Sequence, residues 1–263
     1  MRFNNGYLYQ ADQKEFDEFL AKKCQSKIIS GMDLRRVSFK GRDIDGVDFT
    51  HCHIGDMALM TKEQVRRTPS FTHCTIRNIE NEGEGQINLF LRDCLIGGVV
   101  LRGLADSKIS AISTNIDGIN AAGCTLRLSA TNGTLKHLEL KDCKGEAYLS
   151  SLRLYDLRLR GETRLSEFFF ENISTLGHIH MMPWSVHFTG DLLKIGCQVH
   201  PIEVWKRISD YDINLMAVGA LEWWKEMRET VFAIVDNMAH SLPKVLPYID
   251  LKPQPMYSKY YAV

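Results

Sequence analysis

A short motif returns along this chain at intervals close to 20 residues. Its copies begin at Phe49, Phe71, Leu91, Ala121, Leu140 and Phe170, which lie 22, 20, 30, 19 and 30 residues apart. The first two copies read Phe-Thr-His-Cys-x-Ile, and the cysteine recurs in the next three. A repeat of this period is typical of a solenoid, in which each coil buries its apolar face only by stacking on its neighbours. The two intervals of 30 are interpreted as loops or bulged coils.

The chain has seven cysteines, and several of them occupy the cysteine position of the motif. Those assigned to one shared position are Cys52, Cys74, Cys94 and Cys124. Free cysteine is among the most buried residue types, so a thiol that recurs at one position predicts a buried ladder. We expect these thiols to be reduced rather than joined in disulfides.

Apolar residues recur at every fifth position between Met32 and Asp56. They are Leu34, Phe39, Ile44, Phe49 and Ile54, with polar residues between them. This pattern resembles the pentapeptide-repeat family. The resemblance implies a right-handed quadrilateral β-helix with four pentapeptides, about 20 residues, in each coil.

Further along the chain, apolar residues alternate with polar ones, as in Leu126/Leu128 and Leu138/Leu140. This period of two is typical of strands with one buried face. We therefore predict a mainly β fold, a right-handed parallel β-helix with a capping helix before it and a hairpin with helices after it. The predicted parts are an N-terminal cap at 1–26, the solenoid at 27–176, the hairpin and helices at 177–242, and an extended Pro/Tyr-rich tail at 243–263. Residues 57–69 break the five-residue phase and are expected to loop out.

A second resemblance lies near the C-terminus. It is carried by Ile195-Gly-Cys-Gln-x-His200, then Trp205, then Ala220-x-x-Trp-Trp224. This stretch resembles the C-terminal segment of uncharacterised proteins of tailed phages and prophages. The resemblance implies a viral origin and brings no activity with it.

The charge of the chain is balanced, with 32 basic and 32 acidic residues. No net field therefore draws the protein towards nucleic acid or an anionic membrane. The first residues hold no apolar signal core, and no uncharged apolar run approaches the roughly 20 residues of a membrane helix. We expect a soluble cytoplasmic protein, located in the host cytoplasm if a phage encodes it.

Histidines and a cysteine near residue 190 are weak candidates for a metal site. They are His178, His180, Cys197 and His200. A His-x-His pair on a strand shares one face, and a Cys-x-x-His spacing is tolerated by zinc. However, no second cysteine pair supports the site, and Cys197 ends an apolar stretch. We predict no metal and no cofactor.

Basic residues are concentrated between residues 127 and 164. On stacked coils, neighbouring positions lie about 4.8 Å apart, so these side chains could align into a groove for an anionic small molecule. Guanidinium groups can fork onto phosphate, and the arginines assigned to this groove are Arg127, Arg153, Arg158 and Arg164. A solvated solenoid face has the same composition, so both interpretations stay open.

Aromatic residues near the C-terminus predict an interface. Trp223 and Trp224 are adjacent on an expected helix, so both cannot face one core. The tail adds Tyr257, Tyr260 and Tyr261, and tryptophan and tyrosine dominate binding hot spots. We predict that these five residues contact a partner or a second copy in a homodimer. The alternative, in which tryptophans cap the last coil, stays open.

No motif for nucleophilic catalysis or phosphate binding occurs in the chain. We therefore predict a non-catalytic, phage-encoded binding protein whose expected use is to inhibit a host protein of bacterial defence through protein–protein contacts. Two alternatives stay open. The first is sequestration of an anionic molecule such as a signalling nucleotide, and the second is a polysaccharide-active β-helix enzyme that works with paired carboxylates.

Overall fold

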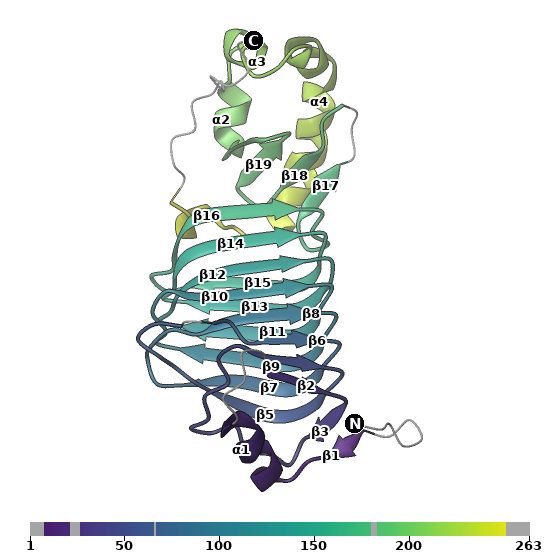
Figure 1. The fold of residues 1–263 in the computed structure, drawn as a ribbon. Helices are drawn as coiled ribbons and strands as arrows, with labels where there is room; N and C mark the ends of the chain where they lie inside the picture. The colour runs from purple at the N-terminus through teal and green to yellow at the C-terminus, as the bar shows by residue number, and fades with distance from the viewer. Residues whose placement is uncertain (1–7, 22–26, 66, 180–182, 251–263) are drawn as a thin grey trace.

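The computed structural model describes residues 8–21, 27–65, 67–179 and 183–250. Its body is a stack of coils whose strands alternate between two parallel eight-stranded sheets (Figure 1). The odd sheet contains β1 (Tyr9–Gln10), β3 (Met32–Leu34), β5 (His53–Met60), β7 (Thr75–Glu82), β9 (Leu95–Arg102), β11 (Asn115–Ala122), β13 (Thr134–Lys141) and β15 (Arg153–Arg160). The even sheet contains β2 (Lys27–Ser30), β4 (Val47–Thr50), β6 (Ser70–Thr72), β8 (Asn88–Arg92), β10 (Ser107–Ile112), β12 (Thr125–Thr131), β14 (Lys144–Ser150) and β16 (Arg164–Glu171). The predicted parallel β-solenoid is confirmed.

The core lies between the two sheets and is filled by the motif residues. Successive side chains of a strand point alternately inward and outward, and the inward ones form rows of apolar contacts along the stack. Phe49 and Phe71 are register partners in β4 and β6, and their rings stack 4.8 Å apart at 4°. Both side chains are fully buried.

Each passage from the even to the odd sheet turns through one residue with a positive φ. These residues are Gly31, His51, His73, Asp93, Ser113, Asn132 and Ser151, and Asn172 repeats the same turn after the last even strand. Glycine adopts this backbone easily, and Asn, Asp and His are enriched among the non-glycine residues that do. The backbone N–H of His51 donates to the Thr72 carbonyl of the next coil at 3.0 Å, and most of the other corners repeat this bond.

The cysteines are buried, as predicted, but they do not share one position. Cys52, Cys74 and Cys94 follow the turn from the even to the odd sheet, whereas Cys124 and Cys143 follow the turn from the odd to the even sheet. The interval of 30 between Cys94 and Cys124 is therefore one and a half coils, not a loop or a bulge. All five thiols are free and at most 1% exposed.

The five-residue period near the N-terminus corresponds to a series of tight turns. The N–H groups of Val37, Arg42 and Val47 donate to the carbonyl three residues earlier, at 3.0–3.1 Å. The prediction that residues 57–69 loop out is wrong for the first four of them. Met57 and Leu59 are buried within β5, and the connection begins at Thr61 because the apolar alternation ends there.

Helix α1 (Gln13–Ala21) covers one end of the stack (Figure 1). The predicted capping box is present, because Asp12 accepts from the Glu15 N–H at 2.9 Å and Glu15 accepts from the Asp12 N–H at 3.0 Å. Phe16 is buried and packs on Phe39 of the first coil, with ring centroids 4.9 Å apart. This contact removes the first coil's apolar surface from water.

The other end is covered by an antiparallel sheet and three α-helices (Figure 1). The sheet is formed by β17 (Gly177–Ile179), β18 (Val186–Phe188), β19 (Leu192–Ile195) and β20 (Gln198–Pro201). The helices are α2 (Ile202–Arg207), α3 (Asp210–Asn214) and α4 (Ala220–Met238). The predicted hairpin is thus part of a four-stranded sheet. No helix in the described ranges is both long and apolar enough to cross a membrane.

The chain then returns to the solenoid through the 3-10 turns η1 (Ala239–Ser241) and η2 (Leu246–Tyr248). The carboxylate of Asp191 accepts the N–H groups of Val245 and Leu246 at 3.0 and 3.1 Å. The N–H of Asp250 then donates to the Leu165 carbonyl on β16 at 2.7 Å. Residues 243–250 of the predicted tail therefore lie on the last coil, and the rest of that tail lies outside the described residues.

We expect Phe71→Ala to lower the free energy of unfolding by about 3–5 kcal/mol, because the vacated site is closed on all sides and leaves a cavity. Urea unfolding measures this change. Phe90→Ala is the matched control: Phe90 points outward from the same sheet, so its loss should cost about 1 kcal/mol or less. Equal effects of the two substitutions would contradict the assigned core.

Thiol labelling tests the burial of the cysteines. Cys24 lies outside the described residues, so the experiment uses the Cys24→Ser variant. The native protein should react rapidly with a chromogenic disulfide reagent at one thiol, the exposed Cys197. All six remaining thiols should react after denaturation. Rapid native labelling of a second thiol would show that the ladder is open to solvent.

Candidate functional site

The two outer faces of the solenoid differ in chemistry. The odd sheet is rich in ion pairs on β11, β13 and β15, where Lys136 lies 2.7 Å from Asp117 and Arg158 lies 2.8 Å from Asp156. The middle of the even sheet instead presents hydroxyl groups in register. They belong to Thr50 and Thr72, to Ser110 and Ser129, and to Thr131 and Ser150. The outer face of β11, β13 and β15 is thus a charge-paired surface.

The four arginines assigned to an anion groove do not come together. Arg127 and Arg164 lie on the even sheet, while Arg153 and Arg158 lie on the odd sheet. Arg127 pairs with Asp106 at 3.3 Å, and Arg164 donates to the Pro247 carbonyl at 3.0 Å. The predicted groove is wrong, because each coil contributes one strand to each sheet. Arginines half a coil apart in the sequence therefore lie on opposite faces of the solenoid.

Trp223 and Trp224 are both buried, at 8% and 1% exposure. The prediction that both of them contact a partner is wrong, because α4 is covered on two flanks and both rings are packed inside the module. Trp224 packs on Trp205 of α2, and Trp223 packs edge-on against Trp184, with ring centroids 5.6 and 5.3 Å apart. The other three predicted interface residues, Tyr257, Tyr260 and Tyr261, lie outside the described residues.

The weak metal candidates are dispersed. His178 stacks on His187 with ring centroids 4.4 Å apart, His200 packs edge-on against Trp205, and Cys197 is exposed. His180 lies outside the described residues. Within the described ranges, no three His, Cys, Asp or Glu side chains are grouped to hold a metal ion.

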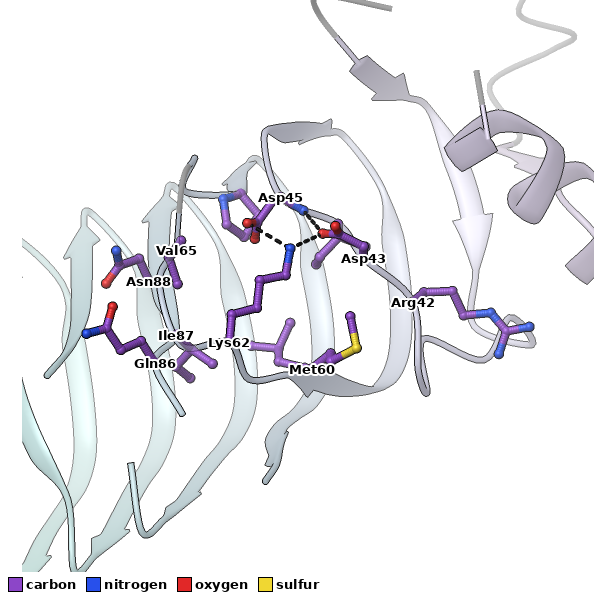
Figure 2. Close-up of a pocket in the computed structure, with 12 residues that line it drawn as sticks. Arg42, Asp43, Asp45, Met60, Lys62, Val65, Gln86, Ile87 and Asn88 are labelled. Carbon is purple, nitrogen blue, oxygen red and sulfur yellow. Dashed lines mark hydrogen bonds and ion pairs between the residues drawn. The ribbon is translucent and has the colours of Figure 1, made fainter. Parts of the chain in front are cut away.

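A small pocket near the N-terminal coils is occupied by a lysine that is already paired (Figure 2). The Nζ of Lys62 lies 2.6 Å from Asp43 Oδ1 and 2.9 Å from Asp45 Oδ2. Burial opposes the charged ammonium, but the hydrogen bonds that Lys62 donates to the two carboxylates outweigh burial and raise the pKa of Lys62. This arrangement ties the β5–β6 connection to the first tight turns, so it is structural.

A larger groove lies where the even face meets the C-terminal sheet. It has a volume of about 500 Å³, and the side chains that define its character are Tyr148, Glu167, Phe169, Glu171, Lys194 and Asp250. The rings of Tyr148 and Phe169 stack 6.5 Å apart on neighbouring strands. The Tyr148 hydroxyl donates to Glu167, and this hydrogen bond raises the pKa of Tyr148 to about 12.

The groove is acidic at its rim. Its three carboxylates face a single ammonium group, that of Lys194, which is only 4% exposed. Lys194 Nζ lies 4.1 Å from the centroid of the Phe169 ring and donates to the Phe170 carbonyl at 3.4 Å. Burial lowers the pKa of Lys194. The surface offered to a ligand is thus aromatic and negative.

Sequence reasoning missed this groove, although a signal was present. Residues 167–171 read Glu-Phe-Phe-Phe-Glu, and in a strand of period two the outward side chains are Glu167, Phe169 and Glu171. An outward phenylalanine between two outward glutamates is a signal of an aromatic and acidic patch on this strand. Lys194 and Asp250, in contrast, reach the groove only through tertiary folding.

The last coil is completed by a histidine. The N–H of Asn172, which has no further coil to bind, donates to Nδ1 of His187 at 3.3 Å. Burial, with smaller contributions from His178 and Lys194, lowers the pKa of His187 to about 4. The neutral ring is therefore the form that can accept this hydrogen bond at pH 7.

Comparison of the chain with protein-family models, with curated proteins and with solved structures found no match.

The lowered pKa of His187 predicts a loss of stability in acid. An unfolded histidine titrates near 6.5, so between about pH 4 and 6.5 the unfolded chain binds more protons and stability rises with pH. The contribution of the neutral His187 ring to the free energy of unfolding is complete above pH 6.5 and is lost as the pH falls through this window. From pH 7 to pH 5, the stability gap between the wild type and His187→Gln should narrow by on the order of 1–2 kcal/mol.

Urea unfolding at the two pH values measures this gap. His240→Gln is the control, because His240 is exposed and its gap to the wild type should stay constant. A gap for His187→Gln that is the same at both pH values would contradict the capping role of the neutral ring.

Proposed function

We propose that the protein is a non-catalytic binding protein that captures a basic segment of a partner protein in the groove at the end of the even face. The observation that carries this proposal is the outward set Glu167, Phe169 and Glu171, with Asp250 beside it. Lysine and arginine stack on aromatic rings and form charge-assisted hydrogen bonds with carboxylates. A basic segment therefore matches both chemical features of the groove.

The state of the groove's polar groups supports binding more than acid–base catalysis. Glu167 already accepts a hydrogen bond from the Tyr148 hydroxyl, and the raised pKa of Tyr148 keeps the proton on that hydroxyl. A polysaccharide-active enzyme would need paired carboxylates available at the sugar. Sequestration of an anionic molecule has no support in this groove, because like charges repel.

The biological setting proposed here rests on the sequence resemblances. Tight turns at a period of five support the likeness of the first coils to pentapeptide repeats. The segment between Ile195 and Trp224 resembles proteins of tailed phages. In that setting, the partner would be a host protein of bacterial defence, inhibited by occupation of its basic segment. The homodimer and the cytoplasmic location stay predictions.

Peptide binding tests the groove directly. A fluorescein-labelled arginine-rich decapeptide should bind the wild type at low ionic strength, as measured by fluorescence anisotropy. Glu171→Lys should weaken this binding at least about tenfold, because it reverses a charge at the contact. Phe169→Ala should weaken it as well, through the lost stacking surface.

Two controls distinguish binding in the groove from a general attraction between the peptide's charge and the protein surface. Glu80→Lys makes the same charge change at an exposed position on the odd sheet and should alter binding less than about twofold. A decapeptide with glutamate in place of arginine should not bind the wild type. Binding of the acidic peptide, or equal effects of the two lysine substitutions, would reject the proposal. A host protein retained by the wild type and lost with Glu171→Lys would then be the partner.

A further inference from the structure

Strand β16 is the last strand of the even sheet, and only one of its two edges is fully paired. On one side it pairs with β14 along its length. On the other side, the described chain supplies a single β-bridge, between Leu165 and Ile249. The groove of about 500 Å³ lies between this second edge and the C-terminal module, and five residues of β16 line it. One side of the groove is therefore formed by the edge of a strand.

The hydrogen bonds of β16 show which backbone groups face this edge. The Glu171 carbonyl accepts from the Ser151 N–H of the preceding coil at 2.9 Å, whereas the Phe170 carbonyl accepts from Lys194 Nζ on the module side at 3.4 Å. Successive residues of a paired strand direct their backbone groups to opposite neighbours, so Phe168 faces the same side as Phe170. Within the described ranges, the Phe168 N–H, the Phe168 carbonyl and the Phe170 N–H have no hydrogen-bond partner on this side.

Ile249 and Asp250 show how a segment lies when it pairs with this edge. They run parallel to β16, and the Asp250 N–H donates to the Leu165 carbonyl at 2.7 Å. Ile249 is buried in the solenoid core, whereas Asp250 is exposed at the groove. Side chains of a strand alternate between its two faces. A longer segment in this position would therefore direct every second side chain outward and the others inward.

The two sides of this position differ in chemistry. The outward side meets the acidic and aromatic set of β16, in which Phe169 lies between Glu167 and Glu171. The inward side is apolar, because the groove residues that pack on the solenoid core are Phe168, Val199 and Ile249. A complementary strand therefore has basic side chains at every second position and apolar side chains between them.

We infer that the partner's basic segment binds as an extended strand added in parallel to β16, with basic and apolar residues alternating along it. This inference rests on the proposed function of the groove and adds the conformation and the residue pattern of the bound segment. Strand addition to an open sheet edge gains affinity from main-chain hydrogen bonds and specificity from alternate side chains. The main-chain bonds are made with Phe168 and Phe170, and the basic side chains contact Glu167, Phe169 and Glu171.

Two peptides of equal composition test the residue pattern on the whole protein. Fluorescein-labelled Arg-Val-Arg-Val-Arg-Val and Arg-Arg-Arg-Val-Val-Val carry the same charge, but only the first places all its arginines on one face of a strand. Fluorescence anisotropy should show the alternating peptide binding at least about tenfold more tightly. Glu171→Lys should weaken its binding at least about tenfold, and Glu80→Lys less than about twofold. Equal affinities of the two peptides would overturn the inference.

Backbone methylation of the alternating peptide tests the main-chain bonds. In a parallel addition the outward residues direct their N–H groups to β16, as Asp250 does. N-methylation of the three arginines should therefore weaken binding at least about tenfold, because the methyl groups replace the donors. N-methylation of the three valines adds the same number of methyl groups and should change the affinity less than about threefold. Equal effects, or a larger effect at the valines, would contradict the parallel strand.

Amide hydrogen exchange, followed by NMR, examines the edge itself. The alternating peptide should slow exchange at Phe168 and Phe170 and leave Phe169, which faces β14, unchanged. Slow exchange of all three amides in the free protein would show that the chain's own residues fill the edge, and would overturn the inference. If no arginine peptide binds, the proposed function itself is rejected. If the peptides bind without these distinctions, only the strand addition is rejected.

Discussion

The backbone hydrogen bonds between successive coils are the constraint on which the rest of this structure depends. Most N–H groups at the corners, such as that of His51, donate to the next coil, so a coil is not complete without a neighbour. Buried backbone groups are almost always paired, and an exposed edge strand invites association. A stack built in this way must therefore be closed at both ends.

The two ends are closed by different means. Helix α1 closes the first coil through an apolar contact, the packing of the Phe16 ring on Phe39. At the last coil the closure combines polar and apolar groups: His187 accepts from Asn172, while Leu192, Val245 and Ile249 extend the solenoid core. The junction of the module with the even sheet leaves a groove of about 500 Å³.

The groove that we propose as the binding site lies at this closed end of the stack. The solenoid supplies regular rows, such as the outward Tyr148 and Phe169, and the added module supplies Lys194 and Asp250 from far along the chain. The four tryptophans lie within the module, where their rings pack on one another. The solenoid thus provides the flat side of the groove, and the C-terminal module provides the side chains that bound it.

The repeat of the sequence was sufficient to predict the parallel solenoid, the burial of its cysteines and the capping box of α1. These features depend on the local spacing of residues and on residue type. The alternation of apolar and polar side chains selects the buried face of each strand, and burial of that face requires the coils to stack. The assignment of Cys94 and Cys124 to one position failed, since a motif that returns after half a coil looks the same in the sequence. The predicted arginine groove was wrong for the same reason, because arginines half a coil apart lie on opposite sheets.

By itself, therefore, the sequence determined which residues are buried and how long a coil is, because both are set by the spacing of apolar side chains. Only the tertiary structure decided which outward residues become neighbours. Arg127 and Arg153 lie on different sheets, whereas Phe169 and Lys194 meet across 24 intervening residues. The physical reason is that the outer face of a sheet has no apolar core to fix its partners, so its contacts are set by where the chain returns.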